Sequence, residues 1–173
     1  MKFPCAVAVS TVAIGLFAVV ALPAVAQTPA ADEAIEQHPT AIHQGTCEAP
    51  GELVADLVSL ISPEGESVGA ASANAVKQGT AVVDLPMADV VGGEHILVAM
   101  GGPTYAPDRQ DEIIACGAIG GVPVDGVLTF GLAPVNDSQH VGLATLREHD
   151  GGSELSIYVV EYAASEAFDE AQS

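Results

Sequence analysis

Positively charged side chains are scarce in this sequence. Four Lys and Arg residues stand against 23 Asp and Glu residues, and the formal net charge is −19. Proteins that bind nucleic acids or anionic membrane surfaces need cationic side chains that face phosphates. The composition therefore excludes these two classes of function. It favours solubility and surroundings that are rich in cations.

Aromatic residues are also scarce, with no Trp, three Tyr and four Phe. The core must therefore be built from Val, Leu, Ile and Ala, which suit packed sheets. A long amphipathic helix is missing as well. Short apolar runs separated by turn residues take its place, and this pattern is typical of all-β domains.

Cysteine is limited to three residues, of which Cys5 lies in the apolar N-terminal stretch. The other two are Cys47 and Cys116. In a small exported domain an even pair of cysteines usually forms a disulfide. Two free buried thiols, or half of a metal site, are the alternatives.

The N-terminal residues have the features of a secretory signal. Lys2 precedes an apolar stretch over 5–22, and Pro23 is followed by Ala-Val-Ala at 24–26. A signal peptidase cleaves after such a pattern, so we predict a signal peptide over 1–26. A retained membrane anchor is the alternative. Export would place the mature chain in a secreted, periplasmic or cell-envelope location.

The remaining chain has the length of one domain. We expect a flexible leader over 27–36, a β-sandwich over 37–162 and an acidic tail over 163–173. The domain should hold about eight antiparallel strands in a Greek-key sandwich, with loops over 62–79 and 101–110, a helical turn over 87–91 and a hairpin turn at 149–152. The run 52–61 also suits a helix. The expected strands are 38–43, 52–61, 80–85, 94–100, 112–119, 126–133, 139–147 and 154–161.

Catalytic motifs are missing. No Gly-x-Ser-x-Gly segment, calcium loop or His-Glu-x-x-His pair is present. His43 and His95 would meet if their strands are neighbours, so these two are the candidate ligands for copper or zinc. The scattered acids could also bind divalent cations loosely.

Two segments carry a resemblance to known proteins. These are Ala-Ile-His-Gln-Gly-Thr-Cys at 41–47 and Ala-Cys-Gly-Ala-Ile-Gly at 115–120. They resemble the copper/zinc superoxide dismutase family and the small secreted bacterial proteins with dismutase-like or CHRD-type domains. The resemblance covers about 37–162 and implies an eight-stranded Greek-key sandwich with a Cys47–Cys116 disulfide.

The copper site of that family does not carry over to this chain. Ala41 stands where the first histidine of a His-x-His pair belongs, and Ile113 where a substrate-guiding Arg belongs. The zinc cluster has no counterpart. A single matched His43 cannot hold a redox copper firmly. The scaffold is therefore expected without its dismutase activity.

We expect an exported, non-catalytic binding or surface module that binds an unidentified protein or small ligand. One alternative is a degenerate dismutase or copper-binding protein that uses His43 with His95 or His140. A second is an acidic structural protein of the envelope that recruits cations. The loop 101–111, with Tyr105 and Arg109, is the predicted recognition loop, because long loops on rigid sandwiches often bind ligands.

Overall fold

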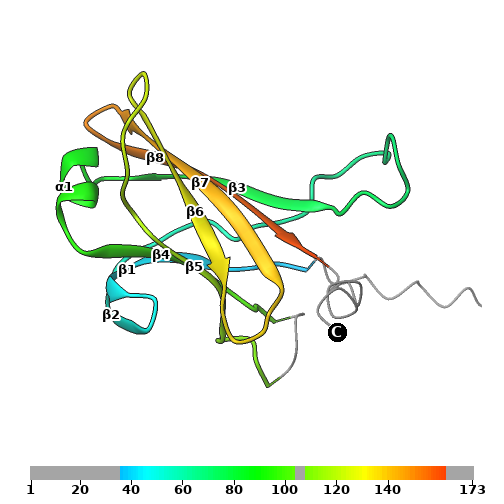
Figure 1. Cartoon of the computed structure of the whole chain (residues 1–173). Helices are drawn as coiled ribbons and strands as arrows, with labels where there is room; N and C mark the ends of the chain where they lie inside the picture. The colour runs from blue at the N-terminus through cyan, green and yellow to red at the C-terminus, as the bar shows by residue number, and fades with distance from the viewer. Residues whose placement is uncertain (1–35, 104–107, 163–173) are drawn as a thin grey trace, which may run out of the picture. The chain divides into compact units, whose positions relative to one another are not determined.

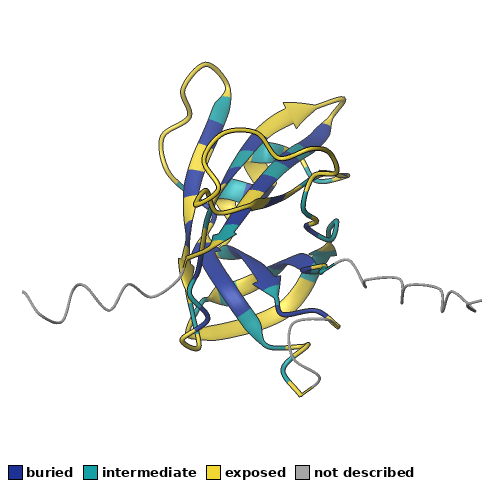
Figure 2. Cartoon of the chain, turned by 90° about the vertical axis from the view of Figure 1, so that its right-hand side faces the viewer, coloured by how far each residue is buried: buried dark blue, intermediate teal, exposed yellow. Residues whose placement is uncertain are grey.

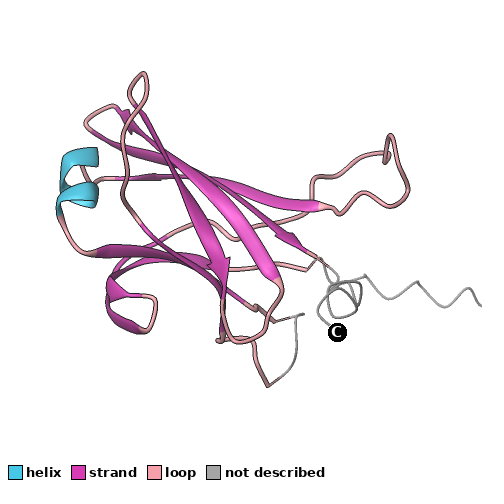
Figure 3. Cartoon of the chain, viewed as in Figure 1, coloured by secondary structure: helices cyan, strands magenta, loops and turns pink. Residues whose placement is uncertain are grey.

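A computed structural model of the chain describes residues 36–103 and 108–162. Eight strands pair antiparallel in one sheet, in the order β2-β1-β4-β5-β6-β7-β8-β3 (Figure 1). One short helix interrupts them between β3 and β4 (Figure 3). The elements are β1 Thr40–Thr46, β2 Ala49–Asp56, β3 Val76–Val83, α1 Met87–Gly92, β4 His95–Met100, β5 Ile113–Ala118, β6 Val127–Pro134, β7 His140–His149 and β8 Gly152–Glu161.

The sheet curls at the junction of β5 and β6. These strands share only two residue pairs, Ala115 with Pro134 and Cys116 with Ala133. Gly117 lies so close to the next strand that an added Cβ would be 2.1 Å from the carbonyl oxygen of Gly131. Glycine thus allows β6 to cross β5 closely and turn away from it. Strands β2-β1-β4-β5 and β6-β7-β8-β3 consequently form the two halves of the curled sheet.

The core lies on the inner face of this sheet and is built from aliphatic side chains. Along β6, Leu128, Phe130 and Leu132 are buried, while the alternate residues are exposed. Figure 2 shows the same alternation along other strands. Period-two alternation is expected for strands with one face on the core and one on solvent. This alternation is visible in the sequence of 127–133, where Leu128, Phe130 and Leu132 share one face.

The β7–β8 hairpin has the turn that its sequence predicts. His149 pairs with Gly152, and the two residues between them, Asp150 and Gly151, have φ values of 47° and 87°. Two central residues with positive φ match the right-handed twist of the flanking strands. This tight turn fixes the register of the longest ladder in the sheet.

The prediction of an all-β fold with about eight antiparallel strands and one disulfide is confirmed, and so is the helical turn at 87–91. The first half of the run at 52–61 is a strand, because β2 ends at Asp56, and the run forms no helix. Several strand boundaries differ from the prediction, most clearly that of β3, which begins at Val76, inside the predicted loop 62–79. The reason is tertiary, since Val76 to Gly79 pair with Val160 to Ile157 of β8. The Greek-key connections and the two-sheet sandwich stay predictions, because the strands form one hydrogen-bonded sheet.

A disulfide joins Cys47, just after β1, to Cys116 in β5. It packs on a second, smaller apolar cluster, on the other face of β1 and β4 from the main core. The buried members of that cluster are Ala41, Ile96, Val98 and Cys116. The predicted pairing of the two cysteines is therefore confirmed. Disulfides persist in oxidising compartments, so the bond indicates a location outside the cytosol.

Several predicted segments lie outside the described residues: the signal peptide 1–26, most of the leader 27–36 and the tail 163–173. Glu36, placed at the end of the leader, belongs instead to the folded part, as shown below. Within 36–103 and 108–162, none of the helical structure has the length and hydropathy of a membrane span.

Replacing Cys47 with Ala should destabilise the fold. The cysteines are 69 residues apart, and closing a loop of that length lowers the entropy of the unfolded chain by an amount worth about 4 kcal/mol. Denaturant unfolding of the Cys47→Ala variant and the oxidised wild type would measure the difference. The reduced wild type is the control and should unfold at the midpoint of the variant. Equal midpoints for oxidised and reduced wild type would contradict the prediction.

Candidate functional site

The two histidines predicted to bind metal lie on neighbouring strands but point to opposite faces. In the β1–β4 ladder, His43 pairs with Ile96 and His95 pairs with Gln44. Directly paired residues share a face and adjacent residues alternate, so the one-residue offset separates the two imidazoles. Each ring instead contacts a backbone carbonyl oxygen: His43 Nδ1 lies 3.1 Å from Gly51 O and His95 Nδ1 lies 2.9 Å from Val90 O.

The surroundings of His95 add no metal centre. His95 lines a shallow depression together with Glu48 and Glu94. Even so, no group of three or more His, Cys, Asp or Glu side chains in the described part of the chain is arranged to hold a metal ion. Metal binding by His43 and His95 stays a prediction, and the geometry does not support the pair as joint ligands.

The predicted recognition loop contributes a structural contact. Arg109 forms an ion pair with Glu112 and donates a 3.1 Å hydrogen bond from Nη2 to the carbonyl oxygen of Asn136. The hydrogen bond from Arg109 holds the pKa of Glu112 below its ordinary value, and it outweighs the smaller effect of burial, which acts to raise that pKa. Arg109 thus ties this loop to the turn before β7. Tyr105 lies outside the described residues.

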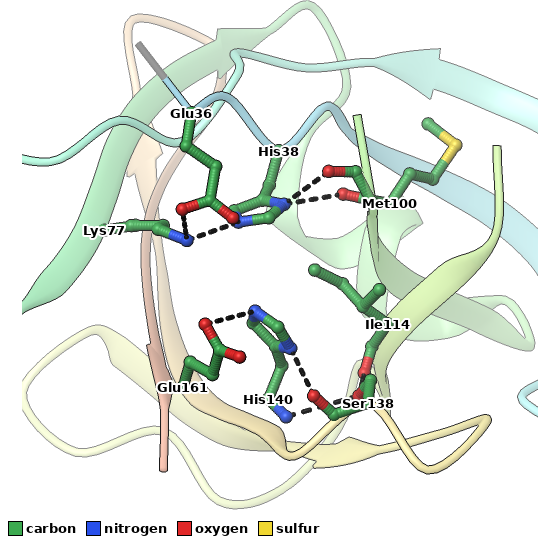
Figure 4. A network of polar contacts seen from close by, with 9 residues as sticks. Glu36, His38, Lys77, Met100, Ile114, Ser138, His140 and Glu161 are labelled. Carbon is green, nitrogen blue, oxygen red and sulfur yellow. Dashed lines mark hydrogen bonds and ion pairs between the residues drawn. The ribbon is translucent and has the colours of Figure 1, made fainter. Parts of the chain in front are cut away.

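Four buried polar side chains, those of His38, Lys77, Ser138 and His140, form a network at one end of the sheet (Figure 4). His38 is fully buried at its centre. Its Nδ1 lies 3.0 Å from Met100 O and 2.9 Å from Gly101 O, and its Nε2 lies 2.7 Å from Lys77 Nζ. Carbonyl oxygens only accept and an ammonium only donates. His38 is therefore neutral, with its proton on Nδ1 and the lone pair of Nε2 facing Lys77.

Glu36 completes the charge balance of the network. Its carboxylate lies 2.6 Å from Lys77 Nζ and 3.5 Å from His38 Nε2. Burial acts to raise the pKa of Glu36, but the hydrogen bond and charge of Lys77 outweigh it and leave the pKa below its ordinary value. Burial, followed by the Lys77 charge, lowers the pKa of His38. Both shifts stabilise the state with Glu36 and Lys77 charged and His38 neutral.

A second buried imidazole packs against the first. The rings of His38 and His140 are 5.2 Å apart and meet edge to face. His140 Nδ1 donates to Ser138 O over 2.7 Å, and the hydroxyl of Ser138 donates to Ile114 O. On its other side, His140 Nε2 lies 3.9 Å from a carboxylate oxygen of Glu161. The network therefore joins the start of the described chain to the ends of β3, β4, β7 and β8.

The segment Glu36 to Pro39, which we call the strap, closes this end of the sheet. His38 exchanges two backbone hydrogen bonds with Leu60, and Met100 N donates to Pro39 O over 2.8 Å. Gly102 has a φ of +77°, and an added Cβ would lie 1.9 Å from Gln37 O. Only glycine allows the strap to approach so closely. The strap is thus held by backbone bonds and locked by the buried side chains.

The outer face of β7, β8 and β3 carries a concentration of exposed apolar side chains. Val141, Val160 and Val76 form one cross-strand row. Leu143 and Tyr158 begin the next, with Leu143 46% exposed. These residues line an open groove of about 280 Å³, and a second hollow between Ile61, Pro63 and β3 shares Tyr158 with it. We call this continuous surface the outer groove.

Beyond Gln78, the edge of β3 forms no backbone hydrogen bond to a further strand among the described residues, although Val58 and Ser59 pack against Gly79. Gln78 of β3 exchanges backbone hydrogen bonds with Ile61, on the side away from β8. Because outward and inward groups alternate in an antiparallel ladder, Thr80 and Val82 point their N–H and C=O groups the same way, beyond the end of that bridge. The exposed side chains of β3 carry no charge. The opposite edge, β2, exposes Pro50, Glu52 and Asp56, which discourage strand addition.

The sequence prediction missed the buried network, although a signal for it was present. Strand alternation places His140 on the same face as the buried Ala144 and Leu146. The same rule groups Lys77 with Val83, provided that β3 is extended back to Val76. His38 carries no such signal, because it precedes β1.

Comparison of the chain with protein-family models, curated proteins and solved structures found no match in any of the three. The resemblance to dismutase-like and CHRD-type proteins therefore stays a proposal.

Acid should remove the stabilisation that Glu36 provides. The pKa of Glu36 is lowered by folding from an ordinary value of 4.5, so its contribution is complete above that pH and is lost as the pH falls below it. Lys77 is buried but Glu36 is partly exposed to solvent, which screens the pair, so its contribution should be about 0.2–1 kcal/mol. Denaturant unfolding at about pH 7 and about pH 3.5 would show a smaller acid loss in Glu36→Gln than in wild type. A matched change at the exposed Glu148, Glu148→Gln, should leave the acid loss as in wild type. An unchanged acid loss in Glu36→Gln would contradict the prediction.

Proposed function

We propose that this chain is an exported, non-catalytic binding module whose outer groove accepts an extended, cationic segment of a partner protein. The concentration of exposed apolar side chains over β7, β8 and β3 carries the proposal. Contiguous apolar surface on an otherwise charged protein commonly marks an interaction site. Export is supported by the disulfide and by the signal-like sequence at 1–26.

The size of the outer groove favours a single segment. Neighbouring strands lie about 4.8 Å apart, and each residue extends a strand by about 3.3 Å. A face that is three strands wide and about seven residues long therefore has an area of roughly 300 Å². A standard protein interface buries about 800 Å² on each partner. The face is therefore too small for a stable dimer of this chain through flat contact, but it suits one strand laid beside β3.

The open edge gives the partner segment its conformation. Thr80 and Val82 offer backbone donors and acceptors to an added strand, which would extend the sheet beyond β3. Alternate side chains of that strand would reach the hollow lined by Thr80 and Tyr158. The charge of −19 then selects a segment with basic residues, because an acidic segment would be repelled.

The dismutase-like or CHRD-type scaffold remains part of the proposal, and the eight antiparallel strands with a Cys47–Cys116 bond support it.

A copper-binding role through His43 is the alternative function. Elemental analysis of the exported protein tests it: about one copper per chain, lost in His43→Ala, would favour this role. The acidic cation-recruiting role predicts a melting temperature that rises with calcium.

A peptide of alternating Val and Lys residues should bind the wild-type chain, and Thr80→Pro should weaken that binding. The N–H of Thr80 points away from β8, so proline removes an outward donor and leaves the ladder to β8 in place. Loss of one backbone hydrogen bond is worth about 1 kcal/mol, or about fivefold in affinity. Fluorescence anisotropy of a labelled peptide would measure the change.

Thr80→Ser is the matched control and should bind as wild type does. Leu143→Gln should also weaken binding, because it removes an apolar side chain of the groove, whereas Val122→Gln changes an exposed Val elsewhere. Equal affinity for an alternating Val and Glu peptide, or no binding of the Val and Lys peptide, would overturn the proposal.

A further inference from the structure

The buried network and the outer groove occupy opposite faces of the same three strand ends. On β3, Lys77 faces inward and Val76 faces outward. On β7, His140 faces inward and Val141 outward, and Val141 pairs with Val160 of β8. Each residue of the first groove row therefore adjoins a residue of the network in the chain: Val76 and Lys77, Val141 and His140, Val160 and Glu161. The backbone that holds the groove row therefore also holds the side chains of the network.

His38 accepts no further proton at Nε2 while the strap is closed. The Nε2 lone pair of His38 faces Lys77 Nζ at 2.7 Å, so a proton there would set two cationic donors against each other. His140 is 5.2 Å away, so two charged imidazoles would also repel each other at close range. Within residues 36–103 and 108–162, the carboxylates that face the pair are those of Glu36, which already binds Lys77, and Glu161, which is 3.9 Å from His140 Nε2.

Releasing the strap relieves this conflict. When Glu36 to Pro39 leave the sheet, His38 enters water and can take a proton at its ordinary pKa of 6.5. The closed form resists that proton, because burial and Lys77 lower the pKa of His38. Protons therefore bind the open form preferentially, and the open population rises as the pH falls below about 6.5.

We propose that the strap and the buried His38–Lys77–His140 cluster form a pH-sensitive latch that holds the outer groove in shape at neutral pH and loosens it in acid. The regulation of binding rests on the proposed function of the groove. The latch itself rests on the network. Histidine is the side chain that titrates in this range, and pairs of buried histidines are a known means of building such switches.

The expected response is large enough to measure. One proton bound preferentially to the open form changes the open population by up to about tenfold per pH unit below the pKa of exposed histidine. Opening of the strap breaks its backbone hydrogen bonds, so the change in the open population can be measured at the amides of His38, Leu60 and Met100. The groove reports it through the amides of Val141 and Val160 in the β7–β8 ladder.

Native-state hydrogen exchange on the full chain tests the latch without any partner. Protection factors, corrected for the intrinsic pH dependence of exchange, would be compared at about pH 7.5 and about pH 5.5. In wild type the strap and groove amides should lose about tenfold in protection, more than the amide of Val98 in the centre of the sheet. His38→Gln should abolish the extra loss. His149→Gln, which changes a histidine in the exposed β7–β8 turn, should retain it.

Equal protection of the strap amides at both pH values would overturn the latch. Loss at the strap with unchanged protection of Val141 and Val160 would overturn its control of the groove. If His38→Gln does not fold, Lys77→Met keeps the imidazole but removes the cation that opposes its proton, and should reduce the acid response. An undiminished response in that variant would overturn the assigned cause.

Binding of the alternating Val and Lys peptide provides a separate measurement. The latch predicts weaker binding at about pH 5.5 than at about pH 7.5 in wild type, and equal binding in His38→Gln. A peptide that binds at neither pH overturns the proposed function, while the exchange experiment still decides the latch. Binding that is unaffected by acid, together with an acid-sensitive strap, overturns the coupling alone.

Discussion

Burial of the Lys77 ammonium group is the constraint on which this end of the molecule depends. An unpaired buried charge is too costly to persist, so Lys77 requires Glu36 at 2.6 Å and the lone pair of His38 at 2.7 Å. Those requirements fix the tautomer of His38, which then needs the two carbonyl oxygens at the end of β4. Pairing one side chain therefore orders the strap and joins the two halves of the curled sheet. His140 packs into the space that remains and extends the network to β8.

Strand alternation explains what could be predicted from the sequence. Together with turn residues, it accounts for the class of fold and the tight turn at Asp150, because these depend on neighbours along the chain. The start of β3 failed because pairing of Val76 with β8 is tertiary and leaves no local pattern. Had that strand been extended, the same alternation would have placed Lys77, His140 and Glu161 together on the inner face.

The arrangement of His43 and His95 shows a related limit of what one sequence reveals. Their strands are neighbours, as the argument for a shared metal required, but a one-residue offset in register sends the two side chains to opposite faces. Register is fixed by turns and by burial of whole faces, so a single sequence does not reveal it for strands that are distant in the chain. Residues matched to a family motif therefore indicate a scaffold more safely than they indicate a site, and the site has to be read from the register.

The charge of the whole chain also accounts for the unguarded edge of β3. An open, uncharged edge strand is a hazard, because copies of the same protein can pair along it. On β2 the exposed residues Pro50, Glu52 and Asp56 discourage such pairing. On β3 no exposed residue serves that purpose, but two copies with a charge of −19 each repel one another before their edges meet. Repulsion of this kind acts only against partners of the same sign. It therefore protects β3 from its own copies and leaves the edge and the groove open to a cationic strand.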